Sequence, residues 1–251
     1  MSKKKDERQF NIRKRINEVE KIRIDDLAKE FQVTPETIRK DIVDMEQQNI
    51  VERKNGYVYL KEYSSEISIV LRNQEYLEEK KAIMMEACKY IQDCMFIYLD
   101  AGSTCQAIIP LLQDKKQITV VTNSTLIAYK CCLNNIHTLV LGGHISNLTN
   151  RTYGEFACQT MDRIHVDVAI LGSLGIKDSD GFTTRESDYT LKRHIMQQSE
   201  KIIVVADCHK FDNKPSYVFA KFHEADIFIT NKLTPEQYNQ VSSIKKIIQT
   251  A

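Results

Sequence analysis

Apolar and polar positions divide the chain into two stretches of different periodicity. Over the first sixty residues, apolar side chains recur at helical spacing in three short segments, and a hairpin-like alternation follows. Further along, short apolar runs alternate with amphipathic segments, which predicts buried strands separated by helices. These runs are 96–99, 119–122, 138–141, 166–171, 202–206 and 227–229. The pattern predicts an α/β chain with a small domain at 1–60, a linker at 61–75 and a larger, mostly parallel open-sheet domain at 76–251.

The second and third helical segments meet at Thr34-Pro35. Thr34 is a favourable N-cap and Pro35 suits the first helical position, so a helix is expected to begin there. Ile38, Ile42 and Met45 predict its buried stripe. Two helices joined by so tight a turn predict a helix-turn-helix, whose second helix enters the DNA major groove by its N-terminal residues. The residues expected to meet DNA from this helix are Thr34, Glu36, Thr37, Arg39 and Lys40.

A hairpin is predicted directly after these helices. Asn55-Gly56 lies between β-prone residues and indicates a type I′ turn. The three helices and the hairpin predict a winged helix-turn-helix, with Arg53 and Lys54 at the wing tip, where a phosphate backbone would lie. The first fifteen residues carry seven basic against two acidic side chains, whereas the net charge of the whole chain is only +1. A helical domain that contacts protein rather than DNA is the alternative.

Small or polar residues follow most of the predicted strands of the larger domain. Because ligands bind outside the carboxyl ends of parallel strands, we expect these turns to converge on one site. After the apolar run 96–99, a Gly-Ser-Thr turn leads into a segment with helical spacing, 106–112, where a helix is expected. Such a turn before a helix offers backbone N–H groups and hydroxyls to an anion, and a lysine adds positive charge. The candidate residues are Asp100, Gly102, Ser103, Thr104, Asn123, Ser124, Gly142, Gly143, Gly172 and Lys210.

Each of these turns could by itself be routine connection chemistry. Gly142-Gly143 in particular could only relieve backbone crowding. Arg151, Arg185 and Lys192 could reach the same anion, or could equally be surface charges.

Two sets of motifs resemble one known family. Asp26-Leu27-Ala28 and Thr34-Pro35-Glu36-Thr37-Ile38-Arg39-Lys40-Asp41 resemble the helix-turn-helix of the DeoR family of bacterial sugar-metabolism regulators, with its V-S-x-x-T-I-R-R-D-L pattern. The larger domain resembles the sensor domain of that family, whose motifs are D-x-G-S-T, T-N-S, G-G, V-D-x-A-F-x-G and D-x-x-K-F. The matching stretches are 100–104, 122–124, 142–143, 166–172 and 207–211.

The resemblance implies a sensor domain similar to ribose-5-phosphate isomerase, a DNA-binding transcriptional regulator and a phosphorylated sugar as effector. Ser103, Thr104 and the neighbouring amides would hold the phosphate; Asp100, Asn123, Ser124 and Lys210 would meet hydroxyls or phosphate. Repression relieved by the effector is the usual sign in this family, with activation left open. Two departures from the family pattern, Cys208-His209 and Tyr153, leave the choice of effector open.

The main alternative is a phosphosugar isomerase fused to a DNA-binding module. Such an enzyme moves a proton between adjacent carbons and needs a positioned carboxylate base. Ribose-5-phosphate isomerases carry D-G-A-D where this chain has Leu171-Gly172-Ser173-Leu174, and leucine cannot transfer a proton. We therefore expect no catalytic residue, although Asp178, Asp180, Glu186 or Asp188 could substitute.

Seven cysteines without a C-x-x-C spacing fit neither a disulfide framework nor a zinc site, which indicates free thiols and a cytoplasmic location. Cys208-His209 is not expected to be a catalytic pair, because neighbours on an extended backbone point to opposite faces. No metal, cofactor, signal peptide or membrane span is expected. The expected partners are operator DNA and further copies of the chain, as a homodimer or homotetramer, because a symmetric operator needs paired recognition helices.

Overall fold

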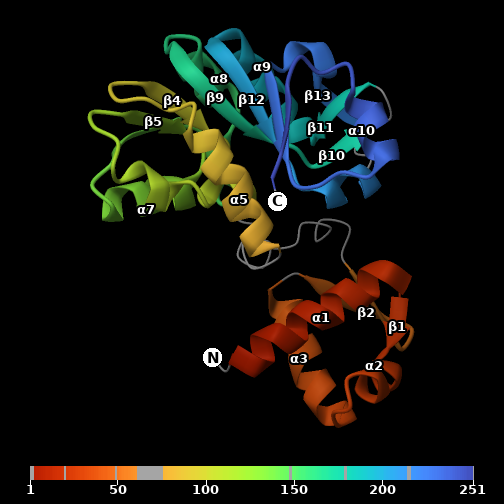
Figure 1. Cartoon of the computed structure of the whole chain (residues 1–251). Coiled ribbons are helices and arrows are strands. Elements are labelled where there is room, and N and C mark those ends of the chain that lie inside the picture. The colour runs from red at the N-terminus through yellow and green to blue at the C-terminus, as the bar shows by residue number, and fades with distance from the viewer. Residues whose placement is uncertain are drawn as a thin grey trace. The chain divides into compact units, whose positions relative to one another are not determined.

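The computed structural model describes residues 3–19, 21–48, 50–60, 76–146, 149–177, 180–213 and 216–250. The chain divides into two compact units, Met1–Leu71 and Arg72–Ala251 (Figure 1). The expected linker, 61–75, lies outside the described residues, so the domain limits at 60 and 76 stay predictions. Among the described helices, none has the length and apolarity to cross a membrane.

The first unit has the three helices and the hairpin that the sequence predicted. Its elements are α1 (Lys3–Val19), β1 (Lys21–Arg23), α2 (Ile24–Glu30), α3 (Pro35–Gln47), β2 (Val51–Lys54) and β3 (Tyr57–Leu60). The strands form an antiparallel sheet in the order β1-β3-β2. Asn55 and Gly56 have φ angles of 53° and 77°, and two positive φ angles are what a type I′ turn requires. Ile38, Ile42 and Met45 lie in the core of this unit, as predicted.

The second unit is built on a seven-stranded parallel sheet in the order β15-β14-β12-β9-β4-β5-β6. Its strands are β4 (Phe96–Leu99), β5 (Thr119–Thr122), β6 (His137–Val140), β9 (Val166–Gly172), β12 (Ser199–Val205), β14 (Ile227–Thr230) and β15 (Ile247–Gln249). Every predicted apolar run is a strand, and the prediction of a mostly parallel sheet is confirmed. The last strand, β15, was not predicted.

Helices cover both faces of this sheet. Figure 1 shows α5 (Leu77–Cys88) and α7 (Thr125–Leu133) on one side, and α8 (Glu155–Met161) and α9 (Glu186–Gln197) on the other. Each side encloses its own cluster of buried apolar residues. A further short helix, α10 (Pro235–Val241), precedes β15.

Several short elements complete the second unit. They are α6 (Ser103–Gln106), the antiparallel sheet of β10 (Gly175–Lys177), β11 (Gly181–Thr184) and β13 (Tyr217–Lys221), the hairpin of β7 (His144–Ser146) and β8 (Arg151–Tyr153), and the 3-10 helices η2 (Ile109–Leu112), η3 (Cys208–Asp212) and η4 (Phe222–Glu224). The segment 106–112, expected to be one helix, is therefore divided between α6 and η2.

Candidate functional site

A cavity lies where the carboxyl ends of β4 and β9 meet. Its volume is about 40 Å³. A single water needs ~10–15 Å³ by this measure, so the cavity admits roughly three water-sized groups, which is comparable with the outer oxygens of one phosphate. Its lining residues are Asp100, Ala101, Gly102, Ser103, Thr104, Arg151, Gly172, Ser173, Leu174, Thr184, Lys192 and Lys210.

Most of the predicted anion-site residues line this cavity. Those that do are Asp100, Gly102, Ser103, Thr104, Gly172 and Lys210. The strand–turn–helix that the sequence predicted over 96–112 explains this, because β4 ends just before the turn and α6 begins at Ser103.

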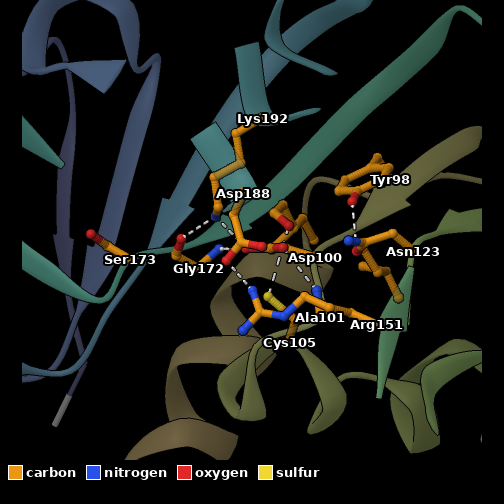
Figure 2. Close-up of polar contacts among 12 residues, drawn as sticks. Tyr98, Asp100, Ala101, Cys105, Asn123, Arg151, Gly172, Ser173, Asp188 and Lys192 are labelled. Atoms are coloured by element: carbon orange, nitrogen blue, oxygen red, sulfur yellow. Dashed lines mark hydrogen bonds and ion pairs between the residues drawn. The ribbon is translucent and has the colours of Figure 1, made fainter. Parts of the chain in front are cut away.

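Asp100 is the centre of the hydrogen bonds at the cavity floor (Figure 2). Its Oδ2 accepts hydrogen bonds from Lys192 Nζ at 2.5 Å and from the Gly172 N–H at 2.9 Å. Its Oδ1 accepts from the Ala101 N–H at 2.9 Å. Both carboxylate oxygens are thus engaged by the protein itself, so this side chain holds the turn in place.

The charge state of Asp100 follows from these contacts. Burial would by itself raise the pKa of its carboxyl group. The positive charge of Lys192 and its hydrogen bond, with Arg151 and the Gly172 N–H, outweigh that cost, and the pKa lies below its ordinary value. Asp100 is therefore ionised at neutral pH.

Lys192 and Arg151 lie in the site rather than on the surface. Lys192 exposes only 4 % of its surface and also donates to the Gly172 carbonyl oxygen at 2.6 Å. Arg151, which comes from β8, is paired with the carboxylate of Asp188 on α9 (Figure 2). Asp188 and Lys192 are four residues apart, which puts both on one face of a helix. This spacing was the signal in the sequence that could have placed Asp188 and Lys192 at one site.

Lys210 has the loosest ion pair of the three cations that line the cavity. Its Nζ lies 3.8 Å from a carboxylate oxygen of Asp207, beyond hydrogen-bonding distance. Asp207 is completely buried, and neither of its carboxylate oxygens has a hydrogen-bond partner in the described part of the chain. The Lys210 ammonium group is therefore held near Asp207 by charge alone, which leaves its hydrogen-bond donors available to an anion.

Asn123 and Ser124 do not line the cavity, contrary to expectation. Asn123 accepts a hydrogen bond from the Tyr98 hydroxyl at 2.9 Å and donates to the Thr152 carbonyl oxygen at 3.1 Å. Ser124 caps α7 by accepting from the Ile127 N–H at 3.2 Å. Both side chains are buried and bonded within the fold.

Gly142 and Gly143 are also outside the cavity lining, and the alternative of backbone crowding explains Gly143. Its φ angle is +127°, and a Cβ built on it would lie 2.4 Å from the Tyr153 carbonyl oxygen. Only glycine fits this position.

Cys208 and His209 have separate partners. The His209 ring stacks on Tyr76 with centroids 3.9 Å apart, and the Cys208 thiol accepts a hydrogen bond from Asn231 Nδ2 at 3.3 Å. The backbone here is a 3-10 helix rather than extended, so the reason given from the sequence was wrong. In the part of the chain that the structure describes, no group of three or more potential metal ligands lies together.

In the first unit, the N-terminal turn of α3 presents the expected DNA-contact residues. Thr34 caps the helix by accepting from the Thr37 N–H at 3.2 Å, and the two hydroxyls lie 2.8 Å apart. Glu36, Arg39 and Lys40 are exposed, and a 3.6 Å ion pair joins Glu36 to Arg39. This turn is therefore accessible to a partner.

Several basic residues near the N-terminus contact this unit itself. Lys5 pairs with Asp44, Arg8 with the buried Asp41, and Arg15 with Glu30. These three cations therefore brace α1 against the helix-turn-helix.

The two wing cations lie on opposite faces of the three-stranded sheet. Arg53 donates to Glu46 of α3 at 3.0 Å, whereas Lys54 pairs with Glu52 at 2.7 Å. On the face that carries Lys54, the side chains of Lys21 and Arg23 lie over the Tyr57 ring. No local pattern in the sequence predicts this group of basic and aromatic side chains, because strand pairing brings it together.

Comparison with known proteins agrees with both units. A family model described as a DeoR-like helix-turn-helix domain matches residues 8–62, and one described as a DeoR C-terminal sensor domain matches residues 75–232. The transcriptional repressor GlcR of Bacillus subtilis (strain 168) is 31 % identical over 210 residues, which cover 83 % of this chain and 81 % of that protein. The glycerol-3-phosphate regulon repressor of Escherichia coli (strain K12) is 27 % identical, over 86 % of this chain and 87 % of that protein.

Among solved structures, a D-ribose-5-phosphate isomerase in complex with phospho-erythronic acid is similar to 53 % of this chain and 53 % of its own, with a TM-score of 0.41 and 24 % identity. The family models account for most of the chain, and the resemblance seen in the sequence motifs is confirmed. This chain belongs to the DeoR family of transcriptional regulators.

Proposed function

We propose that the cavity at the carboxyl ends of β4 and β9 binds a phosphorylated sugar or polyol, and that this ligand controls DNA binding by the helix-turn-helix. The observation that supports this proposal is the lining itself. Two hydroxyl-bearing residues, Ser103 and Thr104, line one small cavity together with the cationic residues Arg151, Lys192 and Lys210. Hydroxyl donors and fixed cations together favour a phosphate.

Lys210 is the cation best suited to meet the phosphate. Lys192 already donates to Asp100 and to a carbonyl oxygen, and Arg151 is paired with Asp188. The looser contact between Lys210 and Asp207 is the easiest to give up. The name of one relative, the glycerol-3-phosphate regulon repressor, agrees with such a ligand.

A role in catalysis is the second candidate, and the cavity favours it less. Leu174, which stands where the isomerase motif has a carboxylate, lines the cavity. Asp100 is a poor general base for neutral pH, because its pKa is held below its ordinary value. We therefore propose a binding site without turnover.

The DNA-binding half of the proposal assigns operator contacts to Thr34, Glu36, Thr37, Arg39 and Lys40 on α3, with Arg53 and Lys54 on the wing. Two copies of the chain would place two recognition helices on a symmetric operator. Repression of sugar-metabolism genes, released by the effector, and a cytoplasmic location complete this proposal.

Thermal-shift measurements with a panel of sugar and polyol phosphates test the effector site. A ligand that binds the native state at 100 times its dissociation constant stabilises it by ~2.7 kcal/mol, so one member of the panel should raise the melting temperature by several degrees. The matching unphosphorylated sugars are the control and should have no effect. The proposal is wrong if no phosphorylated compound raises the melting temperature, or if the sugars do so equally well.

A further inference from the structure

Large apolar side chains are exposed around one edge of the seven-stranded sheet. β6 is an edge strand, paired only with β5 on its inner side. The elements next to it in the chain, α7 before it and β7, β8 and α8 after it, contact one another through α7 and β8 and through β8 and α8. The exposed apolar side chains on these elements are Tyr129 (63 %), Leu133 (66 %), Val140 (41 %), Ile145 (57 %), Tyr153 (38 %) and Phe156 (70 %). We call these residues the β6-edge patch.

The size of the β6-edge patch is close to what a stable interface needs. A whole aromatic side chain offers ~150–250 Å² and an aliphatic one less, so the exposed fractions amount to roughly 600 Å² of mostly apolar surface. A standard interface buries ~800 Å² per partner, and monomers rarely expose apolar patches larger than a few hundred Å². The opposite sheet edge, β15, has no comparable group among the described residues.

The composition of the β6-edge patch also suits an interface core. From Leu133 to Phe156 the sequence contains only two residues with a permanent charge, Arg151 and Glu155. Arg151 is turned inward to Asp188, so it adds no charge to the patch. Depletion of charge with enrichment of Tyr and Phe is the composition of interface cores.

We propose that the β6-edge patch is the surface by which the sensor unit pairs with a second copy of this chain. A two-fold axis beside β6 places this strand antiparallel to the β6 strand of a second copy. The unpaired backbone N–H and C=O groups of the two edge strands can then hydrogen-bond to each other. The apolar side chains of α7 and α8 then cover the two faces of the sheet where the two β6 strands meet.

The other apolar surface of this unit fits a second copy less well. This groove, of about 430 Å³, is lined by Leu77, Met85, Ile109 and Leu111. Lys81 and Lys130 also line it, and burying it under another protein surface would desolvate both ammonium groups.

The test is the mass of the full-length protein in solution, measured by light scattering for wild type, Leu133→Glu and Phe156→Glu. A two-fold interface doubles each substitution, so the dissociation constant should rise by a factor of about 100 and the mass should fall to half or less. Met85→Glu, at a 58 % exposed position in the groove, is the matched control and should keep the wild-type mass. A monomeric wild type, or unchanged masses for both patch variants, overturns the proposal, as does a fall in mass for Met85→Glu alone.

This inference rests on the proposed pairing of DNA-binding units only in that both need two copies. The mass is measured without ligand, so failure of the effector panel leaves the result intact. Conversely, a monomeric variant that keeps its melting temperature and its response to the active sugar phosphate shows that folding and the effector site are undamaged. Loss of that response together with a lower melting temperature indicates misfolding. In that case the mass of a further variant, Val140→Lys on β6 itself, decides whether this surface forms the interface.

Discussion

At the scale of single residues, breaking the buried ion pair of Asp100 and Lys192 should strongly lower the free energy of unfolding. Removing one partner of a buried ion pair leaves an uncompensated charge, which costs ~3–5 kcal/mol. We therefore predict that Asp100→Asn lowers the free energy of unfolding by about that amount at pH 7. Urea unfolding measures the loss, and Asp180→Asn, at the half-exposed pair with Lys177, should change it by less than ~0.5 kcal/mol.

The pH dependence of this loss has a definite sign. The pKa of Asp100 is lowered in the folded protein, so its ionisation stabilises the fold above the ordinary pKa of a free aspartate, near 3.8. That contribution disappears as the pH falls below this value and through the folded pKa. The difference between wild type and Asp100→Asn should therefore shrink as the pH falls from neutral to below about 4. A difference that grows on acidification would contradict the assigned charge state.

A second residue-scale prediction concerns Lys210. Its weak contact with Asp207 and its place in the cavity lining are the grounds for proposing that it meets the effector phosphate. Lys210→Ala should raise the dissociation constant of the effector roughly tenfold or more, because a charge-assisted hydrogen bond contributes about 1.5–3 kcal/mol. Operator affinity without effector should stay at the wild-type value. Gel-shift titrations with and without effector measure both, with Lys245→Ala, a 73 % exposed lysine, as the control.

The residues that sequence reasoning placed correctly are those whose position follows from neighbours in the chain. Gly102, Ser103 and Thr104 reach the cavity because a strand must end before them and a helix must begin. Asn123 was misplaced because its partners, the Tyr98 hydroxyl and the Thr152 carbonyl oxygen, come from distant segments. A polar residue at a strand end can serve the fold or a ligand, and only the tertiary contacts decide.

At the scale of elements, helix caps were easier to predict than helix interruptions. Thr34-Pro35 fixes the start of α3 to the residue, because the cap and the proline act locally. The helix expected over 106–112 is broken instead, and Pro110 explains this: it lacks an N–H donor and its ring crowds the carbonyl group four residues earlier. The pairing of β11 with β13 joins segments more than thirty residues apart, which no local pattern encodes.

The exposed turn of α3 carries the element-scale prediction. Arg39 is 53 % exposed and only loosely paired with Glu36, so it is available to DNA. Arg39→Ala should weaken operator binding by about 1–3 kcal/mol. If Arg39 meets a base, the loss will be largest on the cognate operator; if it meets a phosphate, all sequences lose equally and the salt slope falls by about one. Fluorescence-anisotropy titrations at several salt concentrations distinguish the two, and unchanged affinity would remove Arg39 from the interface.

At the scale of the whole molecule, effector binding and operator binding must be coupled energetically if the protein is a switch. An effector that changes operator affinity by a given factor must have its own affinity changed by the same factor when operator is bound. Coupling of this kind is typically about 1–3 kcal/mol, or roughly 5–150-fold. Its sign separates repression released by the effector, in which operator weakens effector binding, from activation.

Reciprocity also separates a switch from an enzyme with an attached DNA-binding module. We predict that calorimetric titration of the active sugar phosphate gives two dissociation constants, with and without operator DNA, whose ratio equals the ratio of operator affinities with and without effector. Incubation of the protein with that sugar phosphate should leave it chemically unchanged, because the cavity presents Leu174 where proton transfer would need a carboxylate and keeps Asp100 tied to Lys192. An enzyme would show the opposite pair of results: it would convert the sugar phosphate, and its affinity for that compound would be the same with and without operator DNA. Since the two measurements are independent, turnover together with reciprocal coupling would mean that this one cavity performs both tasks.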